Sequence, residues 1–229
     1  MMLTARDCTW QLHPHRALSR VTPTASRRAL FLALFLCGSL TWAAPAWSGT
    51  EIGQPAPDFS LADTRGSVHQ LSDARGSFVV LEWYNPDCPF VKKHYGSGNL
   101  PRLQRDFASR GVVWFVINSS APGEQGHYPP EEYEDMLASH HAAPAAMLLD
   151  HDGTAGLRYG AKTTPHLFIV DPEGTLIYAG GIDDRPSADP ADIPDAENYV
   201  ARALGEALEG RAVTLSRTQP YGCSVKYAD

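Results

Sequence analysis

The chain has 229 residues and a net charge of −7, from 19 Lys and Arg against 26 Asp and Glu. The charge is uneven, because residues 1–48 hold five Arg and one Asp and the remainder holds 14 basic and 25 acidic residues, a net of −11. So acidic a body argues against nucleic acid as a partner and against an anionic membrane surface, since both need a basic face. The hydrophobic share of 43% excludes a disordered chain.

Residues 1–48 have the pattern of an export signal. Arginines 16, 20, 27 and 28 precede an apolar run over 29–40, and small residues follow at 44–48. The run is about 12 residues long, short of the ~20 that a spanning helix needs, which favours a cleaved signal. No charge lies between Arg28 and Glu51, so an uncleaved membrane anchor through residues 29–47 is the alternative. Either form predicts a periplasmic or other extracytoplasmic location.

The elements expected after residue 49 alternate between strands and helices. The prolines of 52–59 indicate an extended segment. We then expect a buried strand over 78–84, a turn at 85–89 leading into a helix as far as 110, a strand at 112–117, a helix at 130–140, a strand at 146–149, a hairpin of 166–170 with 175–179, and a last helix at 196–208. This order predicts one α/β domain over 49–229, with a central mixed sheet flanked by helices and a C-terminal tail at 211–229.

Cys88 stands directly after the buried strand 78–84, at the predicted first turn of a helix that begins with Pro89. Free N–H groups and the helix dipole favour an anion there, and a thiol at such a position can have a pKa of about 3.5–7.5 in place of about 8.5. A buried, inert cysteine is the alternative. We predict that Cys88 is a nucleophile.

Two stretches carry a family resemblance. Residues 53–91, from Gly-Gln-Pro-Ala-Pro-Asp-Phe to Tyr-Asn-Pro-Asp-Cys-Pro-Phe-Val, and residues 159–171, with Thr-Thr-Pro-His-Leu-Phe-Ile-Val-Asp, resemble the redoxin family. This family holds the alkyl hydroperoxide reductase/thiol-specific antioxidant proteins and extracytoplasmic thioredoxin-like proteins. The resemblance implies a thioredoxin-like fold and an oxidoreductase without a cofactor. Protein thiols and disulfides, or small thiols and peroxides, are then its substrates, with an external reductant.

The sequence departs from the family at two points that concern the reaction. Cys88 matches the attacking cysteine of a Cys-x-x-Cys motif, but Val91 stands at the second position. The peroxiredoxin pattern Pro-x-x-x-Thr-x-x-Cys also fails, since Leu81 and Asn85 replace its Pro and Thr. The chain therefore resembles a redoxin without the usual peroxidatic site.

Further site residues follow from the resemblance. Glu82 matches the buried acid of thioredoxin-like proteins, where desolvation raises the pKa and allows a proton relay; an exposed or ion-paired strand residue is the alternative. Thr164 and Pro165 match the cis-proline loop, which in the family lies beside the thiol and pairs with a bound peptide. Pro89 and Trp83 complete the expected substrate-binding set, with core packing as the alternative for Trp83.

Cys223, in the tail sequence Gln-Pro-Tyr-Gly-Cys-Ser, is the only other cysteine after residue 48. It is a candidate resolving cysteine, and a static Cys88–Cys223 bridge is the alternative. A one-cysteine thiol peroxidase, or a non-catalytic binding or metal-carrying module, would be the rival functions. We predict no metal site, because the Cys-x-x-x-Cys pair of copper-carrying thioredoxin-fold proteins is absent and the adjacent His140 and His141 cannot share one helix face.

Overall fold

The apolar run after residue 77 forms β3 (Val79–Trp83), whose five residues are all buried. In the computed structural model of the protein, which describes residues 50–228, β3 pairs with a parallel strand on one side and an antiparallel strand on the other. The expected signal or anchor over 1–48 lies outside the described residues. Within them, no helix is long and apolar enough to cross a membrane.

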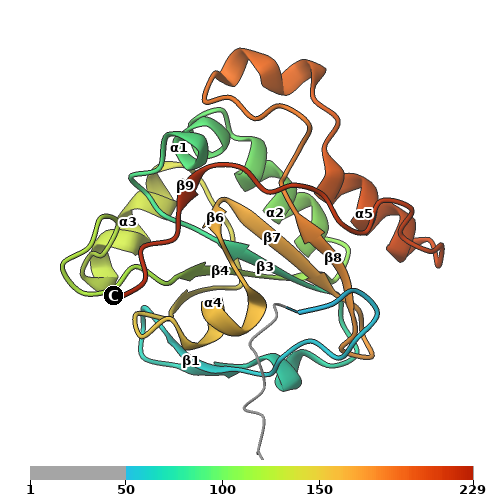
Figure 1. The fold of residues 1–229 in the computed structure, drawn as a ribbon, viewed down its shortest axis with the longest axis horizontal. Coiled ribbons are helices and arrows are strands. Elements are labelled where there is room, and N and C mark those ends of the chain that lie inside the picture. Colours follow the sequence, from blue (N-terminus) through green and yellow to red (C-terminus); the bar gives the residue numbers. More distant parts are fainter. Residues whose placement is uncertain (1–49, 229) are drawn as a thin grey trace, which may run out of the picture. The chain divides into compact units, whose positions relative to one another are not determined.

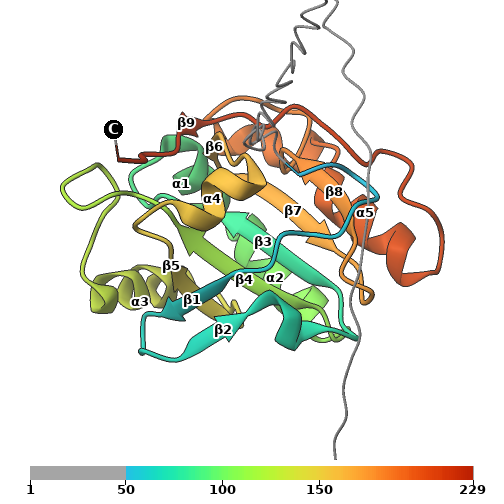
Figure 2. The same ribbon diagram turned by 60° about the horizontal axis from the view of Figure 1, so that its bottom comes forward.

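Seven strands form one mixed sheet in the order β2-β1-β5-β4-β3-β7-β8 (Figures 1 and 2). The strands besides β3 are β1 (Ser60–Asp63), β2 (Val68–Gln70), β4 (Val113–Asn118), β5 (Ala146–Leu149), β7 (His166–Val170) and β8 (Leu176–Gly180). A separate two-stranded ladder joins β6 (Thr163–Thr164) to β9 (Cys223–Ser224). The helices are α1 (Pro89–Gly96), α2 (Asn99–Ala108), α3 (Pro130–Ser139), α4 (Thr154–Tyr159) and α5 (Tyr199–Leu208), with 3₁₀ helices at Leu71–Ala74 and Pro190–Asp195.

Successive strand residues point to opposite faces of the sheet, and each face has its own core. On one face, Val80, Val116 and Ile169 pack against apolar residues of α1, α2, α3 and α5. On the other, Leu81 and Ile117 pack against α4 and the N-terminal segment of the domain. The sheet is thus buried on both sides, which explains the near-continuous apolar sequence of β3, β4 and β7.

The structure confirms the mixed sheet. The strands expected at 78–84, 112–117, 146–149, 166–170 and 175–179 lie at 79–83, 113–118, 146–149, 166–170 and 176–180. The structure corrects the single helix expected over 89–110. Gly98 has φ 74°, in the left-handed region, so the chain bends there and continues as the separate helix α2. The short elements β1, β2, α4 and β6 were not predicted, because segments of two to six residues carry too little periodicity.

The C-terminal tail docks along its length rather than ending free. The Ala179 N–H donates to Ser216 O (3.0 Å), the Val225 N–H to Lys162 O (3.1 Å) and the Ala121 N–H to Lys226 O (2.8 Å). In Figure 1 the tail, in red, runs from beside β8 across β6 and past α1. Backbone pairing thus places Cys223 at the end of the sheet where β3 stops.

Candidate active site

Cys88 is the N-cap residue of α1, with Pro89 as the first helical residue. Its backbone carbonyl accepts from the Lys92 N–H (2.9 Å), and its own N–H donates to Asn85 O (3.1 Å). The side chain is fully buried. The thiol therefore lies at the positive end of the helix, where a thiolate is stabilised.

The thiol of Cys88 contacts the loop that contains the cis peptide bond Thr164–Pro165. Its Sγ donates to the backbone oxygen of Thr164 at 2.9 Å. Both loop residues are buried. The sequence thus correctly predicted that this loop lies beside the thiol, and the structure shows which atom meets the sulfur.

Cys223 lies on the same loop from the other side, because it is the register partner of Thr164 in the β6–β9 ladder. Since the Thr164 oxygen also contacts the Cys88 sulfur, Cys223 lies close enough to affect the pKa of Cys88. Gly222 permits this approach: its φ is +134°, and a Cβ there would lie 2.0 Å from Thr164 O. The structure therefore brings the two cysteines together, and neither forms a disulfide.

The two thiols differ in acidity. Burial alone raises the pKa of Cys88, but hydrogen bonds with the Cys223 N–H, with Thr164, with the Cys223 thiol and with the Val91 N–H outweigh it, so the pKa of Cys88 is lowered. The pKa of Cys223 is raised to about 11, first by burial and then by the hydrogen bond and charge of Cys88. Ionisation of the pair is therefore favoured at Cys88 over Cys223.

Glu82 is fully buried on the face of the sheet that α1 and α2 cover. Its carboxylate accepts from Tyr95 Oη (2.8 Å), Trp114 Nε1 (2.8 Å) and Gln104 Nε2 (3.2 Å). Burial raises the pKa of Glu82 to about 7, although the three hydrogen bonds lower it. The expected buried acid is present, and its donors are these three side chains, not the Cys88 thiol.

Trp83 was expected in the substrate-binding set, but the structure places it in the core. Its side chain is fully buried on the α4 face, where it packs against Tyr159 and Phe168 and donates to Ser119 Oγ (3.0 Å). It points away from Cys88 because Glu82 and Trp83 are neighbours on a strand and face opposite sides. Pro89, in contrast, is exposed beside the thiol.

Sequence reasoning missed a buried polar cluster that fastens the tail to α1. Tyr221 Oη donates to Asp183 Oδ1 (2.5 Å) and lies 3.1 Å from His94 Nε2, while His94 Nδ1 is 2.9 Å from Asn99 Nδ2. Burial, and next the charge of Lys93, lowers the pKa of His94 to about 3, so the ring is neutral. The only sequence signal was an aromatic residue next to Gly222 in the tail. The cluster holds Tyr221 two residues from Cys223.

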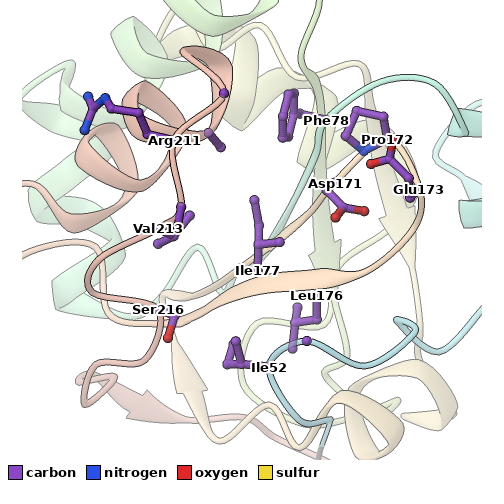
Figure 3. Close-up of a pocket in the computed structure, with 14 residues that line it drawn as sticks. Ile52, Phe78, Asp171, Pro172, Glu173, Leu176, Ile177, Arg211, Val213 and Ser216 are labelled. Carbon is purple, nitrogen blue, oxygen red and sulfur yellow. The ribbon is translucent and has the colours of Figure 1, made fainter.

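The cysteines do not line the apolar pocket at the other end of β3. An apolar pocket of about 600 Å³ lies at the turn between β7 and β8, where Phe78, Ile177 and Val213 point into a common space (Figure 3). Phe78 precedes β3 and Cys88 follows it, so this pocket lies at the opposite end of the strand. Among residues 50–228, no three His, Cys, Asp or Glu side chains come together as a metal site.

Comparison with known proteins agrees with this geometry. Residues 52–179, more than half of the chain, match the AhpC/TSA family. The chain belongs to this family. The redoxin resemblance is therefore confirmed, and with the mixed sheet, the cysteine at the start of α1 and the cis-proline loop, the fold is thioredoxin-like.

Individual relatives are distant. The thiol-disulfide oxidoreductase ResA of Bacillus subtilis is 26% identical over 130 residues, which cover 55% of this chain and 64% of that protein. The thiol:disulfide interchange protein DsbE of Pseudomonas aeruginosa is 26% identical over 151 residues, which cover 64% of this chain and 76% of that protein. The crystal structure of an uncharacterized conserved protein from Geobacillus kaustophilus superimposes with a TM-score of 0.64 at 28% identity and covers 78% of this chain and 93% of that one.

Proposed function

We propose that the protein is a thiol–disulfide oxidoreductase in which Cys88 attacks and Cys223 resolves. The observation that carries the proposal is that Cys223 pairs with Thr164, whose backbone oxygen lies 2.9 Å from the Cys88 sulfur at the N-terminus of α1. Relatives that are named as thiol-disulfide oxidoreductases or thiol:disulfide interchange proteins support it. Cys223 of the tail thus replaces the second cysteine of a Cys-x-x-Cys motif, where this chain has Val91.

The reaction has two exchange steps. The Cys88 thiolate attacks one sulfur of a substrate disulfide, forms a mixed disulfide and releases the other sulfur as a thiolate. The Cys223 thiolate then attacks the Cys88 sulfur, forms the Cys88–Cys223 disulfide and releases the second substrate thiolate. The substrate gains two electrons and two protons, and an external dithiol returns the protein to its reduced form. The reverse sequence oxidises a substrate dithiol.

The acidities of the two cysteines set the order of these steps. In the reduced protein, the charge on Cys88 is one cause of the raised pKa of Cys223, so Cys88 is the thiolate that attacks first. Formation of the mixed disulfide removes that charge and the hydrogen bond between the thiols. The pKa of Cys223 then falls, and its thiolate becomes available for the second attack.

The docked tail also controls access to the thiol. Cys88 is fully buried, and β9 occupies the backbone edge of β6 beside it. A protein substrate therefore reaches the sulfur only after β9 has left β6. The tail then returns with Cys223 for the second step.

The Cys223→Ser variant tests the pair. It is expected to accumulate a mixed disulfide with a small disulfide substrate such as oxidised glutathione, because the internal thiolate that releases it is gone. Mass spectrometry of the peptide that contains Cys88 measures the adduct and separates it from modification of Cys8 or Cys37. The parent protein is expected to release the same adduct and to yield the Cys88–Cys223 disulfide.

Two controls separate this proposal from its rivals. The Cys88→Ser variant should form no intramolecular disulfide and complete no exchange, because the sulfur that attacks first is gone. Release of the Cys88 adduct at the same rate in the Cys223→Ser variant and the parent would remove Cys223 from the mechanism. Hydrogen peroxide consumption at the same rate in that variant and the parent would instead indicate a one-cysteine peroxidase.

Glu82 and the location complete the proposal. We propose that Glu82 exchanges protons with the site near neutral pH, so Glu82→Gln should remove an inflection near pH 7 from the rate of disulfide exchange. We also propose that the protein acts outside the cytoplasm, with protein thiols and disulfides as its substrates. The basic and apolar sequence over 16–48 supports this location, and a fusion to a reporter that is active only after export tests it.

A further inference from the structure

A pocket of about 630 Å³ lies between α4 and the tail, on the face of the sheet opposite to α1. Tyr159, Phe168 and Ala179 form its apolar walls, while Lys162, His166 and Arg217 contribute polar groups. His166 is the register partner of Trp83, the last residue of β3. The pocket therefore lies at the same end of the sheet as Cys88, but the proposed exchange reaction does not use it.

The charges of the pocket are opposite to those of the domain. Lys162 and Arg217 are exposed cations, and no residue that lines the pocket is Asp or Glu. Both cations act on the same ring: after burial, the charges of Lys162 and Arg217 are the causes that lower the pKa of His166 to about 3. A purely cationic lining in a domain of net charge −11 favours an anion.

His166 supplies a directed donor. The residue is buried, with an exposed fraction of 6%. Its Nδ1 accepts from the backbone N–H of Lys162 (3.3 Å), which leaves the proton of the neutral ring on Nε2. Among the described residues, Nε2 has no hydrogen-bond partner, although the ring lines the pocket. An acceptor atom in the pocket would complete its hydrogen bonding.

We propose that this pocket binds a small organic carboxylate, with the carboxylate between Lys162, Arg217 and His166 and the apolar body against Tyr159 and Phe168. The lining selects this class in two ways. Two cations and an N–H donor match a carboxylate. The volume of about 630 Å³ is larger than an inorganic ion fills, and the aromatic walls favour a ligand with an apolar body. Binding at this site does not require the thiol of Cys88.

Benzoate is a suitable probe, with benzamide as its uncharged counterpart and inorganic phosphate as an anion without an apolar body. The ring signals of His166, followed by NMR in the labelled protein, should shift saturably with benzoate. The pKa of His166 should rise, because a bound carboxylate stabilises the imidazolium. Benzamide and phosphate should bind more weakly than benzoate.

Arg217→Gln should weaken benzoate binding by about five-fold, the effect of one partly solvated charge pair. Arg110→Gln, which removes an exposed cation outside the pocket, should leave binding unchanged. Equal affinities in these two variants, or no saturable shift of His166, would overturn the proposal. Phosphate binding as tight as benzoate binding would overturn the organic part of it. None of these results depends on disulfide exchange, so failure here leaves the proposed function intact.

Discussion

Cys88 and Cys223 show how residues of one type acquire opposite properties. Backbone N–H groups at a helix N-terminus stabilise a negative charge on Cys88, whereas Cys223 lies next to that charge. The pKa of Cys88 is therefore lowered and that of Cys223 is raised, although both are partly or fully buried. The environment, not the thiol, assigns the attacking role.

We expect the alkylation rate of Cys88 in the Cys223→Ser variant to titrate below the value of about 8.5 that is typical of a free cysteine. The backbone N–H groups at positions 223 and 91 and the helix dipole all remain in this variant. Iodoacetamide labelling across pH, read at the Cys88 peptide, measures the midpoint. A midpoint at or above 8.5 would contradict an activated nucleophile.

Glu82 makes stability depend on pH in a direction set by its raised pKa. The folded protein binds this proton more tightly than the unfolded chain does, so the contribution to stability is full below pH 4.5 and is lost as pH rises through about 7. Glu82→Gln cannot ionise and should lose less stability. Between pH 5 and pH 8, the free energy of unfolding of the parent should fall by about 2–3 kcal/mol more than that of the variant.

Urea unfolding at the two pH values provides this comparison. Glu131→Gln, on the exposed side of α3, is the matched control and should follow the parent. Parallel pH dependence in the Glu82 variant and the parent would mean that the buried carboxyl titrates normally. The glutamine can keep the hydrogen bonds, because its oxygen accepts from Trp114 and Gln104 and its amide donates to the Tyr95 hydroxyl.

At the scale of elements, the ladder of β6 and β9 decides whether the two cysteines meet. Gly222→Ala would place a methyl group 2.0 Å from Thr164 O and should push β9 away from the loop. Release of a mixed disulfide at Cys88 should then slow by about ten-fold or more, since a small displacement of a reacting group is costly. Stopped-flow measurement of the released thiol records the rate.

Gly210→Ala is the control for this effect. Gly210 also has a positive φ, +71°, but a Cβ there meets no atom within 4 Å. The substitution therefore also places Ala at a positive φ, but without a contact that would move β9, and release should proceed at the parental rate. If the two variants release the thiol equally fast, contact between Gly222 and Thr164 does not position Cys223.

Elements that are long and apolar were predictable, and short ones were not. The strands β3, β4 and β7 are rich in β-branched and aromatic residues, and β5 is Ala-Met-Leu-Leu, as expected for strands of a doubly covered sheet. The two-residue strands β6 and β9 have no pattern of their own, because they exist through pairing of segments about 60 residues apart. For the same reason, the sequence suggested that Cys88 and Cys223 pair but did not predict how close the two residues lie.

At the scale of the whole molecule, a Cys88–Cys223 disulfide would close a loop of about 135 residues. In the chain-entropy model such a link stabilises the folded state by up to about 5 kcal/mol. The oxidised protein should therefore have a higher urea midpoint than the protein in dithiothreitol. The Cys223→Ser variant should show no such difference, and equal midpoints for both forms of the parent would mean that the disulfide strains the fold.

The sequence by itself determined the family, the buried strands, the position of Cys88 at a helix start and the cis-proline loop, because these depend on local patterns of residues. Only the tertiary structure decided which groups meet the Cys88 sulfur, that Trp83 belongs to the core, and that His94, Tyr221 and Asp183 fasten the tail. These contacts join residues far apart in the chain, and their distances follow from how the sheet, α1 and the tail pack together. Local sequence patterns do not specify that packing.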